Sequence, residues 1–284
     1  MSARAGGRVP GSLVSRAAGT GTARRYWLLR LIVLVAAVGL WQLWASSHHS
    51  PFFPPPSAIV ARMYRLWFSA PAAHLFLTRD ATGNLLPSLA RILGGLAIAA
   101  AIGIPAGIAI GRSGALSGYV DPLLQFARTL PPVALVTVFI AIFKLGTQME
   151  IAFIAFGTIW PVLLNTIDGA RSVDPLQVET ARVFALPAGQ RLARLIVPAT
   201  MPRMFAGLRL SLSLAVLLMV FSELVGSSNG IGYEMNNASS SFDLTALWSG
   251  IVLVAIFGIV LNALLSGVEH RVLRWHRGAR RRAE

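Results

Sequence analysis

The sequence lacks cysteine, contains a single lysine and carries few charges for its length. Without cysteine the chain can form no disulfide, no thiolate nucleophile and no zinc–thiolate site. Its one lysine, Lys144, precedes Leu145, so there is no G-x-x-x-x-G-K-[ST] loop to hold nucleotide phosphates. Charged residues make up 13% of the 284 residues, against about 25% in soluble domains. These absences exclude thiol chemistry and P-loop ATP hydrolysis, and they argue against a water-soluble protein.

Long apolar runs account for the low charge. A hydrocarbon core about 30 Å thick requires roughly 20 apolar residues in a helix, and the runs at 85–110 and 244–265 satisfy this requirement. The sequence therefore predicts an all-α polytopic membrane protein. We expect six transmembrane helices, at 27–44, 85–110, 123–143, 151–167, 204–225 and 244–265.

Arginine gathers at alternate ends of these predicted spans. It is frequent near both termini and in the segment 168–203, whereas 226–243 has neither lysine nor arginine. Because basic residues favour the cytoplasmic side, we expect both termini and 168–203 to be cytoplasmic. The predicted organisation is a disordered basic cytoplasmic arm at 1–25, the first transmembrane helix with an outer amphipathic helix at 26–83, a core at 84–268 and a basic cytoplasmic tail at 269–284.

The first span has a second interpretation, because Arg24 and Arg25 precede an apolar run that is followed by "ASS". This order is also typical of a cleaved signal peptide. The bulky Trp41 and Trp44 instead suit the interfacial belt of a retained helix. We therefore expect the span to stay in the protein.

The segment 174–198 is polar and helix-prone, although apolar spans flank it. Asp174 and Pro175 form a helix start, with a side-chain cap followed by proline at the first helical position. Pro187 is expected to turn the chain, and a second short helix is expected to end at Pro198. Such a hairpin either docks into a groove on a partner or lies on the membrane surface held by arginine. Each helix has an apolar stripe, formed by Val178, Ala181 and Ala185 in the first and by Leu192, Leu195 and Ile196 in the second.

"ETARVFA" followed by "LIVP" resembles the EAA loop of bacterial ABC importer permeases, whose pattern is Glu-Ala-Ala, three residues, Gly, nine residues and Ile-x-Leu-Pro. Glu179, Ala181 and Pro198 match it, whereas Thr180, Leu195 and Val197 replace an Ala, the Ile and the Leu. Ala185 stands at the glycine of the turn. Since alanine tolerates positive φ poorly, we expect Pro187 and Gly189 to supply the bend instead. "GYVDPLLQFARTLPPVAL", "WPVLLNTIDGARSVDP", "FSELVGSSNGIGY" and "HRVLRW" are similar to the nitrate, sulfonate and taurine branch of this family.

The resemblance implies a type I ABC importer permease fold of the MetI-like kind, with cytoplasmic coupling helices, in a bacterial inner membrane. It implies that the chain is a non-catalytic subunit in which ATP and magnesium are used by a separate ATPase dimer. The other implied partners are a second permease subunit, identical or different, and an extracytoplasmic substrate-binding protein. The implied cargo is a small anionic solute such as a sulfonate, taurine or nitrate. The implied coupling residues are Glu179, Thr180, Ala181, Ala185, Leu186, Gly189 and Pro198.

Other residues are candidates for helix packing, for the outer loop or for the substrate pathway. Gly103, Gly107 and Gly111 recur every fourth residue and favour close helix packing within the chain. Gly226, Gly230 and Gly232 are expected to shape the outer loop that meets the binding protein. Arg128, with Thr129 and the following prolines, starts or breaks the third span. Glu223 is either functional, solvated or paired with Arg91. The pathway candidates are Gln125, Arg128, Thr129, Trp160, Asn165, Ser211 and Glu223.

Two other classes of function are less consistent with the sequence. An ion-coupled secondary transporter is the main alternative, but it typically has interrupted repeats and acids near the middle of the membrane. The span centres lack such acids, and no repeat is evident. "GSSNG" fits the G-x-S-x-G pattern of hydrolases, but it follows a predicted membrane span rather than a strand. We therefore expect no enzyme, and we expect no metal site because the pair His48–His49 lacks further ligands.

Overall fold

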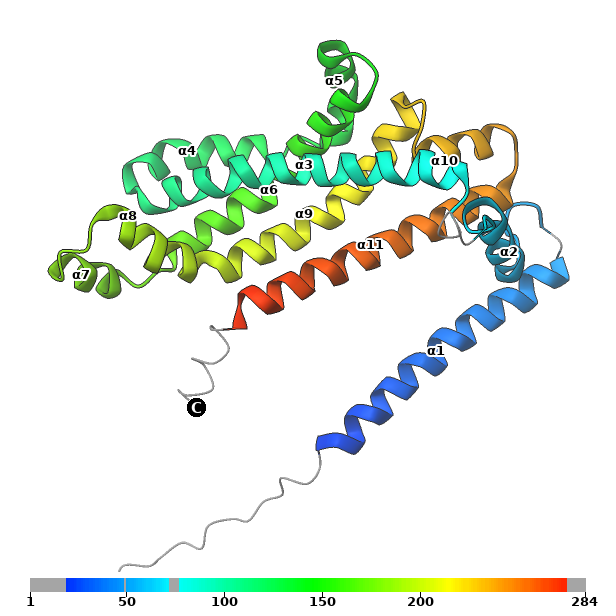
Figure 1. Ribbon diagram of the computed structural model, residues 1–284, viewed down its shortest axis with the longest axis horizontal. Helices are drawn as coiled ribbons and strands as arrows, with labels where there is room; N and C mark the ends of the chain where they lie inside the picture. The colour runs from blue at the N-terminus through cyan, green and yellow to red at the C-terminus, as the bar shows by residue number, and fades with distance from the viewer. Residues whose placement is uncertain (1–18, 49, 72–76, 275–284) are drawn as a thin grey trace, which may run out of the picture. The chain divides into compact units, whose positions relative to one another are not determined.

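The computed structural model describes residues 19–48, 50–71 and 77–274, and every regular element in these ranges is a helix (Figure 1). The chain divides into two units, Met1–Ala58 and Ile59–Glu284, which are described separately. Residues 1–18 of the predicted arm and 275–284 of the predicted tail lie outside the described residues.

The first unit contains one long helix, α1, which covers Gly19–His48. It begins inside the segment predicted as a disordered arm. Its part Leu28–His48 is long and apolar enough to cross a membrane, in agreement with the span predicted at 27–44. Helix α2, Pro56–Trp67, starts after the proline-rich stretch and continues into the second unit.

The core of the second unit is built from three long helices. These are α3 (Arg79–Arg112), α6 (Thr147–Arg171) and α9 (Val197–Gly226), and α6 contacts both of the others along its length. Helix α11, Leu244–Val272, runs beside α9 (Figure 1). The buried cluster between the helices includes Ile92, Phe153 and Met219. Each helix extends beyond its predicted span, because polar turns at the ends continue the helix.

Small residues on α3 allow its close contact with α6. A Cβ placed on Gly107 would lie 2.7 Å from the Cβ of Thr166, and one on Gly111 would lie 2.7 Å from the carbonyl oxygen of Ile167. Gly103 similarly faces Val162. This stripe therefore contacts a helix of the same chain, and larger side chains there would force the two helices apart.

The segment predicted as the third span, 123–143, is not one straight helix but is broken after Arg128 and Thr129. The structure has α4 (Gly114–Ala127), then a 3₁₀ turn (Pro132–Leu135) that leads into α5 (Val136–Phe143), with a bend of 79° between the two parts. Pro131 and Pro132 cause the break, because they lack backbone N–H donors and disfavour helical geometry in the residue before them. The described residues therefore contain five helices able to cross a membrane, or six if the bent pair forms one span.

A second buried cluster lies where α9 ends. The chain turns after Gly226 into α10, Ile231–Ser240, which contacts both α9 and α11. Trp67, Ala81, Ile231 and Leu253 are buried together there. This packing holds the ends of α2, α3, α10 and α11 around the loop 227–230.

Candidate functional site

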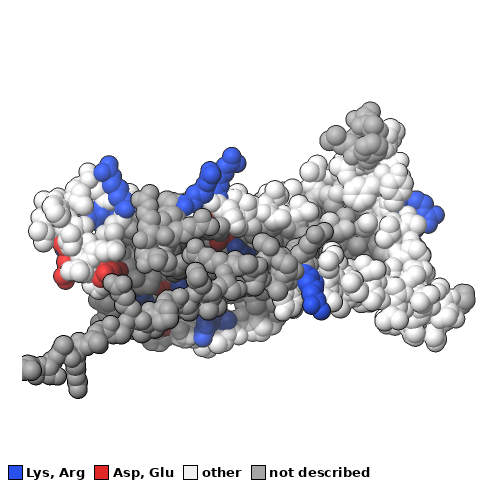
Figure 2. All heavy atoms as spheres, turned by 90° about the horizontal axis from the view of Figure 1, so that it is seen from below, with Lys and Arg blue, Asp and Glu red and all other residues white. Residues whose placement is uncertain are grey.

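The hairpin predicted at 174–198 lies at one end of the second unit (Figure 1). Its first arm is α7, Pro175–Val183, which starts as predicted: the Leu176 N–H donates a hydrogen bond of 2.9 Å to Asp174 Oδ1. Figure 2 shows both acidic and basic side chains at this end, whereas the opposite end of the visible face is largely uncharged. The hairpin is therefore a polar protrusion from an apolar helical body.

The turn of the hairpin is made by Ala185 itself, with φ of +51°. The Leu186 N–H donates to the Ala181 carbonyl at 3.0 Å, and the Ala185 N–H donates to the Arg182 carbonyl at 2.9 Å. These two bonds form a Schellman motif, which normally has glycine at the left-handed position. Alanine there costs about 1–2 kcal/mol. We expected Pro187 and Gly189 to supply the bend in place of Ala185. This expectation is wrong, since Gly189 lies in the short helix α8, Ala188–Arg191.

The second arm does not end at Pro198, which corrects another expectation. Helix α8 leads through a π-turn, Leu192–Ile196, into α9. The apolar helical run is therefore continuous from Ala188 to Gly226, a stretch of 39 residues. A π-turn shifts the hydrogen-bond pattern by one residue, and proline needs no N–H partner, so the helix passes the proline without a break. The hairpin is thus joined directly to the fifth span.

The predicted apolar stripe of the hairpin is only half buried, since Ala185 and Leu192 are exposed and Leu195 is partly exposed. Val178, Ala181 and Ile196 are buried. The large apolar side chains that are exposed on α7 and at its C-cap are Leu176 (67%), Val183 (84%) and Phe184 (76%), and we call these three residues the apolar tip. Leu176 and Val183 are seven residues apart and so lie on one face of α7, and Phe184 follows Val183 as the C-cap. Glu179 and Thr180 are exposed between them in sequence, so this face combines one carboxylate with a large apolar area.

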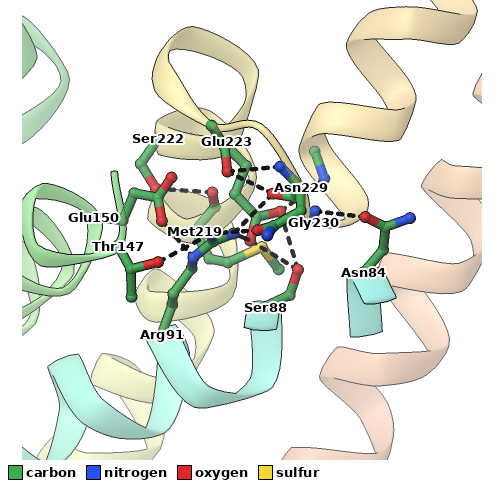
Figure 3. Close-up of polar contacts among 12 residues, drawn as sticks. Asn84, Ser88, Arg91, Thr147, Glu150, Met219, Ser222, Glu223, Asn229 and Gly230 are labelled. Carbon is green, nitrogen blue, oxygen red and sulfur yellow. Dashed lines mark hydrogen bonds and ion pairs between the residues drawn. The ribbon is translucent and has the colours of Figure 1, made fainter. Parts of the chain in front are cut away.

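A polar stripe lies near the other end of the core, on the first turns of α3. Asn84, Ser88 and Arg91 are all buried, and their spacing of four and three residues places them on one face. Figure 3 shows this face directed toward α9 and the loop that follows it. Buried polar groups require partners, and these three residues find them far away in the sequence.

Arg91 lies between two buried carboxylates (Figure 3). Its Nη1 is 2.6 Å from Glu223 Oε1, and its Nε forms an ion pair with Glu150. Both acidic side chains are 0% exposed, and the arginine is 3% exposed. The Ser88 hydroxyl also donates to Glu223 at 2.7 Å. We call Arg91, Glu150 and Glu223 the ion cluster. With all three groups ionised, it carries one more negative charge than positive charge.

The ion cluster also holds the loop before α10. The Gly232 N–H donates to Glu223 Oε2 at 2.8 Å, and Arg91 donates to the carbonyl and side-chain oxygens of Asn229 at 2.9 and 2.6 Å. Gly230 has φ of +119°, and a Cβ there would lie 2.4 Å from the Glu223 carboxyl carbon. Gly230 and Gly232 are buried against Glu223, so they shape this loop from the inside. A Cβ on Gly226 would meet Leu145 at 2.8 Å.

Comparison with known proteins identifies the family. Residues 103–274 match the family described as the binding-protein-dependent transport system inner membrane component. The chain belongs to this family. It is therefore an ABC transporter permease, a membrane subunit.

Individual relatives and solved structures agree with this assignment. The permease is 31% identical to SsuC of Bacillus subtilis (strain 168), which is named for the transport of aliphatic sulfonates, over 97% of this chain and 98% of that one. It is 28% identical to the taurine transport system permease protein TauC of Escherichia coli (strain K12), over 79% and 80%. A chain of the inward-facing MetNI methionine ABC transporter has the same fold, with 17% identity, a TM-score of 0.56 and coverage of 66% of the permease and 94% of that chain.

The structure separates the seven pathway candidates into three groups. Gln125, Arg128 and Thr129 are exposed around the break between α4 and α5. Trp160 and Asn165 are partly buried on α6, where the Asn165 amide donates to the Pro161 carbonyl. Ser211 and Glu223 are buried: the Ser211 hydroxyl donates to the Thr158 carbonyl at 2.6 Å and ties α9 to α6. Of these seven side chains, those of the first group are the most exposed within this chain.

Sequence reasoning noted that Glu223 could pair with Arg91 but missed Glu150, Asn84 and Ser88. Glu150 precedes the span predicted at 151–167, whereas in the structure it lies in the first turn of α6 and is buried. The signal for the other two was present, since Asn84, Ser88 and Arg91 recur at helical spacing in an otherwise apolar run.

Proposed function

We propose that the permease forms the transmembrane pathway of an ATP-driven importer and couples to a separate cytoplasmic ATPase through the apolar tip. An exposed Val183 and Phe184 beside Glu179 make a compact surface of the kind that inserts into a groove on a partner. The Schellman turn fixes the angle between α7 and α8, so a force on α7 moves the second arm instead of being absorbed by a loose loop.

The continuous helix supports this mechanical role. From Ala188 to Gly226 it has 39 residues, and at 1.5 Å per residue its length is about 58 Å. One end joins the hairpin, and the other end places Glu223 in the ion cluster. Movement of the hairpin by the ATPase would therefore reach the far side of the membrane along one element.

The proposed orientation places the hairpin and both termini in the cytoplasm, in a bacterial inner membrane. The arginine distribution supports this, because the segment 168–203 is rich in arginine whereas 226–243 has neither arginine nor lysine. The loop 227–230 and α10 then lie on the outer side, where an extracytoplasmic binding protein would deliver the substrate. The second permease subunit, identical or different, would complete the pathway.

We infer that the cargo is a small anion of the sulfonate, taurine or nitrate type. Relatives named for aliphatic sulfonates, for taurine and for bicarbonate support this inference, since all of these solutes carry an anionic group. Arg128 is exposed at the break of the bent pair, where a cation would favour an anion. Thermal-shift measurements on the cognate binding protein with taurine, alkyl sulfonates, nitrate and bicarbonate test this. Stabilisation only by neutral or cationic solutes would contradict it.

The coupling role is tested by Phe184→Ser, with Phe242→Ser as the matched control. Both phenylalanines are highly exposed, at 76% and 81%, but Phe242 follows α10 at the opposite end of the core. We expect Phe184→Ser to reduce co-purification of the co-expressed ABC ATPase and to lower ATP-dependent uptake by at least about tenfold, as for a central apolar anchor. Phe242→Ser should retain the ATPase. Equal retention by both variants would contradict docking at the apolar tip.

A further inference from the structure

A groove of about 600 Å³ lies between the end of α3 and the inner side of the hairpin. Its apolar lining includes Ile104 and Ile108 of α3 and Ile196 of the π-turn, and three arginines, Arg112, Arg182 and Arg191, also line it. None of the described residues that line the groove has a carboxylate. This one cavity therefore has an apolar floor on the membrane-spanning part of α3 and a basic rim at the end of that helix.

The three arginines retain donors for a ligand. None of them makes an ion pair with a described residue, although four other arginines do. The Arg112 Nη1 donates to the Ala170 carbonyl at 3.3 Å, which leaves most of its five N–H donors available. Arg182 is exposed, and Arg112 and Arg191 are partly exposed. The groove therefore concentrates positive charge without an internal counter-charge.

We propose that this groove binds an anionic phospholipid of the cytoplasmic leaflet, with the phosphate on the three arginines and an acyl chain on the apolar floor. Basic pockets beside transmembrane helices on the cytoplasmic side suit such headgroups. The chain's own termini are poor occupants of this basic groove, because like charges repel. Residues 1–25 contain arginines and no acid, and the C-terminal tail is also rich in arginine. The lipid would join the hairpin to α3 and would brace the coupling element against the membrane.

The cytoplasmic position of the groove rests on the proposed orientation, but the binding test does not require the ATPase. Native mass spectrometry of the full-length chain in detergent measures bound phosphatidylglycerol, phosphatidylcholine and free glycerol phosphate. We expect phosphatidylglycerol to bind at least about tenfold more tightly than either of the others, because it alone offers both a net negative headgroup and acyl chains.

Arginine variants localise the site. Arg182→Gln with Arg191→Gln removes two rim charges and should weaken phosphatidylglycerol binding about 30-fold. Arg194→Gln with Arg203→Gln removes the same charge from exposed positions in and after the second arm that do not line the groove. This control should change binding less than threefold. Equal weakening by both double variants would overturn the site in favour of diffuse surface attraction.

A third variant tests the apolar floor. Ala109 is exposed and lines the groove, so Ala109→Trp fills it without disturbing a buried contact. It should lower phosphatidylglycerol binding to the level of glycerol phosphate. Unchanged binding would overturn the acyl-chain part of the proposal. If the first double variant instead lost the co-expressed ATPase but kept its lipid, the groove would be an ATPase contact and the lipid proposal would be wrong.

Discussion

Removing the positive charge of the ion cluster should destabilise the permease more than removing either negative charge. Arg91→Leu leaves Glu150 and Glu223 buried without their cation, and breaking a buried pair in this way costs about 3–5 kcal/mol. The Asn229 oxygens would also lose their donor. At about 2–4 °C per kcal/mol, the expected fall in the midpoint of thermal unfolding is about 6–20 °C.

The two glutamates should differ from each other. Glu223 accepts hydrogen bonds from Arg91, Ser88 and the Gly232 N–H, so Glu223→Gln turns an acceptor into a donor facing donors and should cost about 1–3 kcal/mol. Glu150 forms its ion pair with the same arginine, but it does not accept the Ser88 and Gly232 hydrogen bonds that hold Glu223. Glu150→Gln also removes the excess negative charge of the ion cluster, so it should change the free energy of unfolding by close to zero.

The measurement is thermal unfolding of the purified full-length variants, followed by size-exclusion chromatography with fluorescence detection. Arg209→Leu is the matched control, since Arg209 pairs with Glu269 but is about half exposed, and such pairs contribute at most about 1 kcal/mol. The expected order of destabilisation is Arg91→Leu, then Glu223→Gln, then Arg209→Leu and Glu150→Gln. An Arg91→Leu midpoint no lower than that of Arg209→Leu would refute the reasoning.

Three further predictions concern single positions. Ala185→Gly should relieve the strain of the Schellman turn and raise the unfolding midpoint slightly. Ala185→Val should lower the midpoint and reduce ATP-coupled uptake. A higher midpoint for the valine variant than for the glycine variant would exclude a left-handed residue at this turn. Gly230→Ala should strongly lower the unfolding midpoint, because the added Cβ would collide with the Glu223 carboxylate. Gly118→Ala is the control: it lies at an open helical position, so the added methyl group should stabilise the fold by about 0.5–1 kcal/mol. Thermal unfolding of both variants checks this. Ser211→Ala should cost about 1 kcal/mol, without changing uptake selectivity if the residue only ties α9 to α6.

Local sequence signals predicted the elements that depend on local physics. The apolar runs located the long helices to within a few residues or turns, because burial of backbone polar groups in lipid permits little else. The Asp174–Pro175 start of α7 was predictable because a cap and a proline act within one turn. The family, and with it the existence of the hairpin, followed from short motifs with fixed spacing.

Features that depend on distant contacts were not predictable in this way. Arg91 reaches Glu223 across 132 positions, and the sequence does not say whether such a pair meets inside the fold or in solvent. The effects of the prolines were predicted only in part. Pro198 was expected to end a helix that in fact continues through a π-turn, whereas the break at Pro131 and Pro132 was expected but its angle of 79° was not. The stripe of α7 correctly marked Val178 and Ala181 as buried, but it did not indicate that Ala185 would be exposed at the turn.

The 79° bend between α4 and α5 has a consequence for hydration. Non-helical backbone cannot face hydrocarbon, because lipid tails offer no hydrogen bonds to free carbonyl and amide groups. At the bend, Pro131 and Pro132 offer no N–H at all, and Arg128 carries a full charge. If the bend lies at membrane depth, this corner must be wet or covered by another subunit. A wet corner would place water beside the charge of Arg128, whereas a covered corner would require the covering subunit to offer hydrogen-bond partners to the bend.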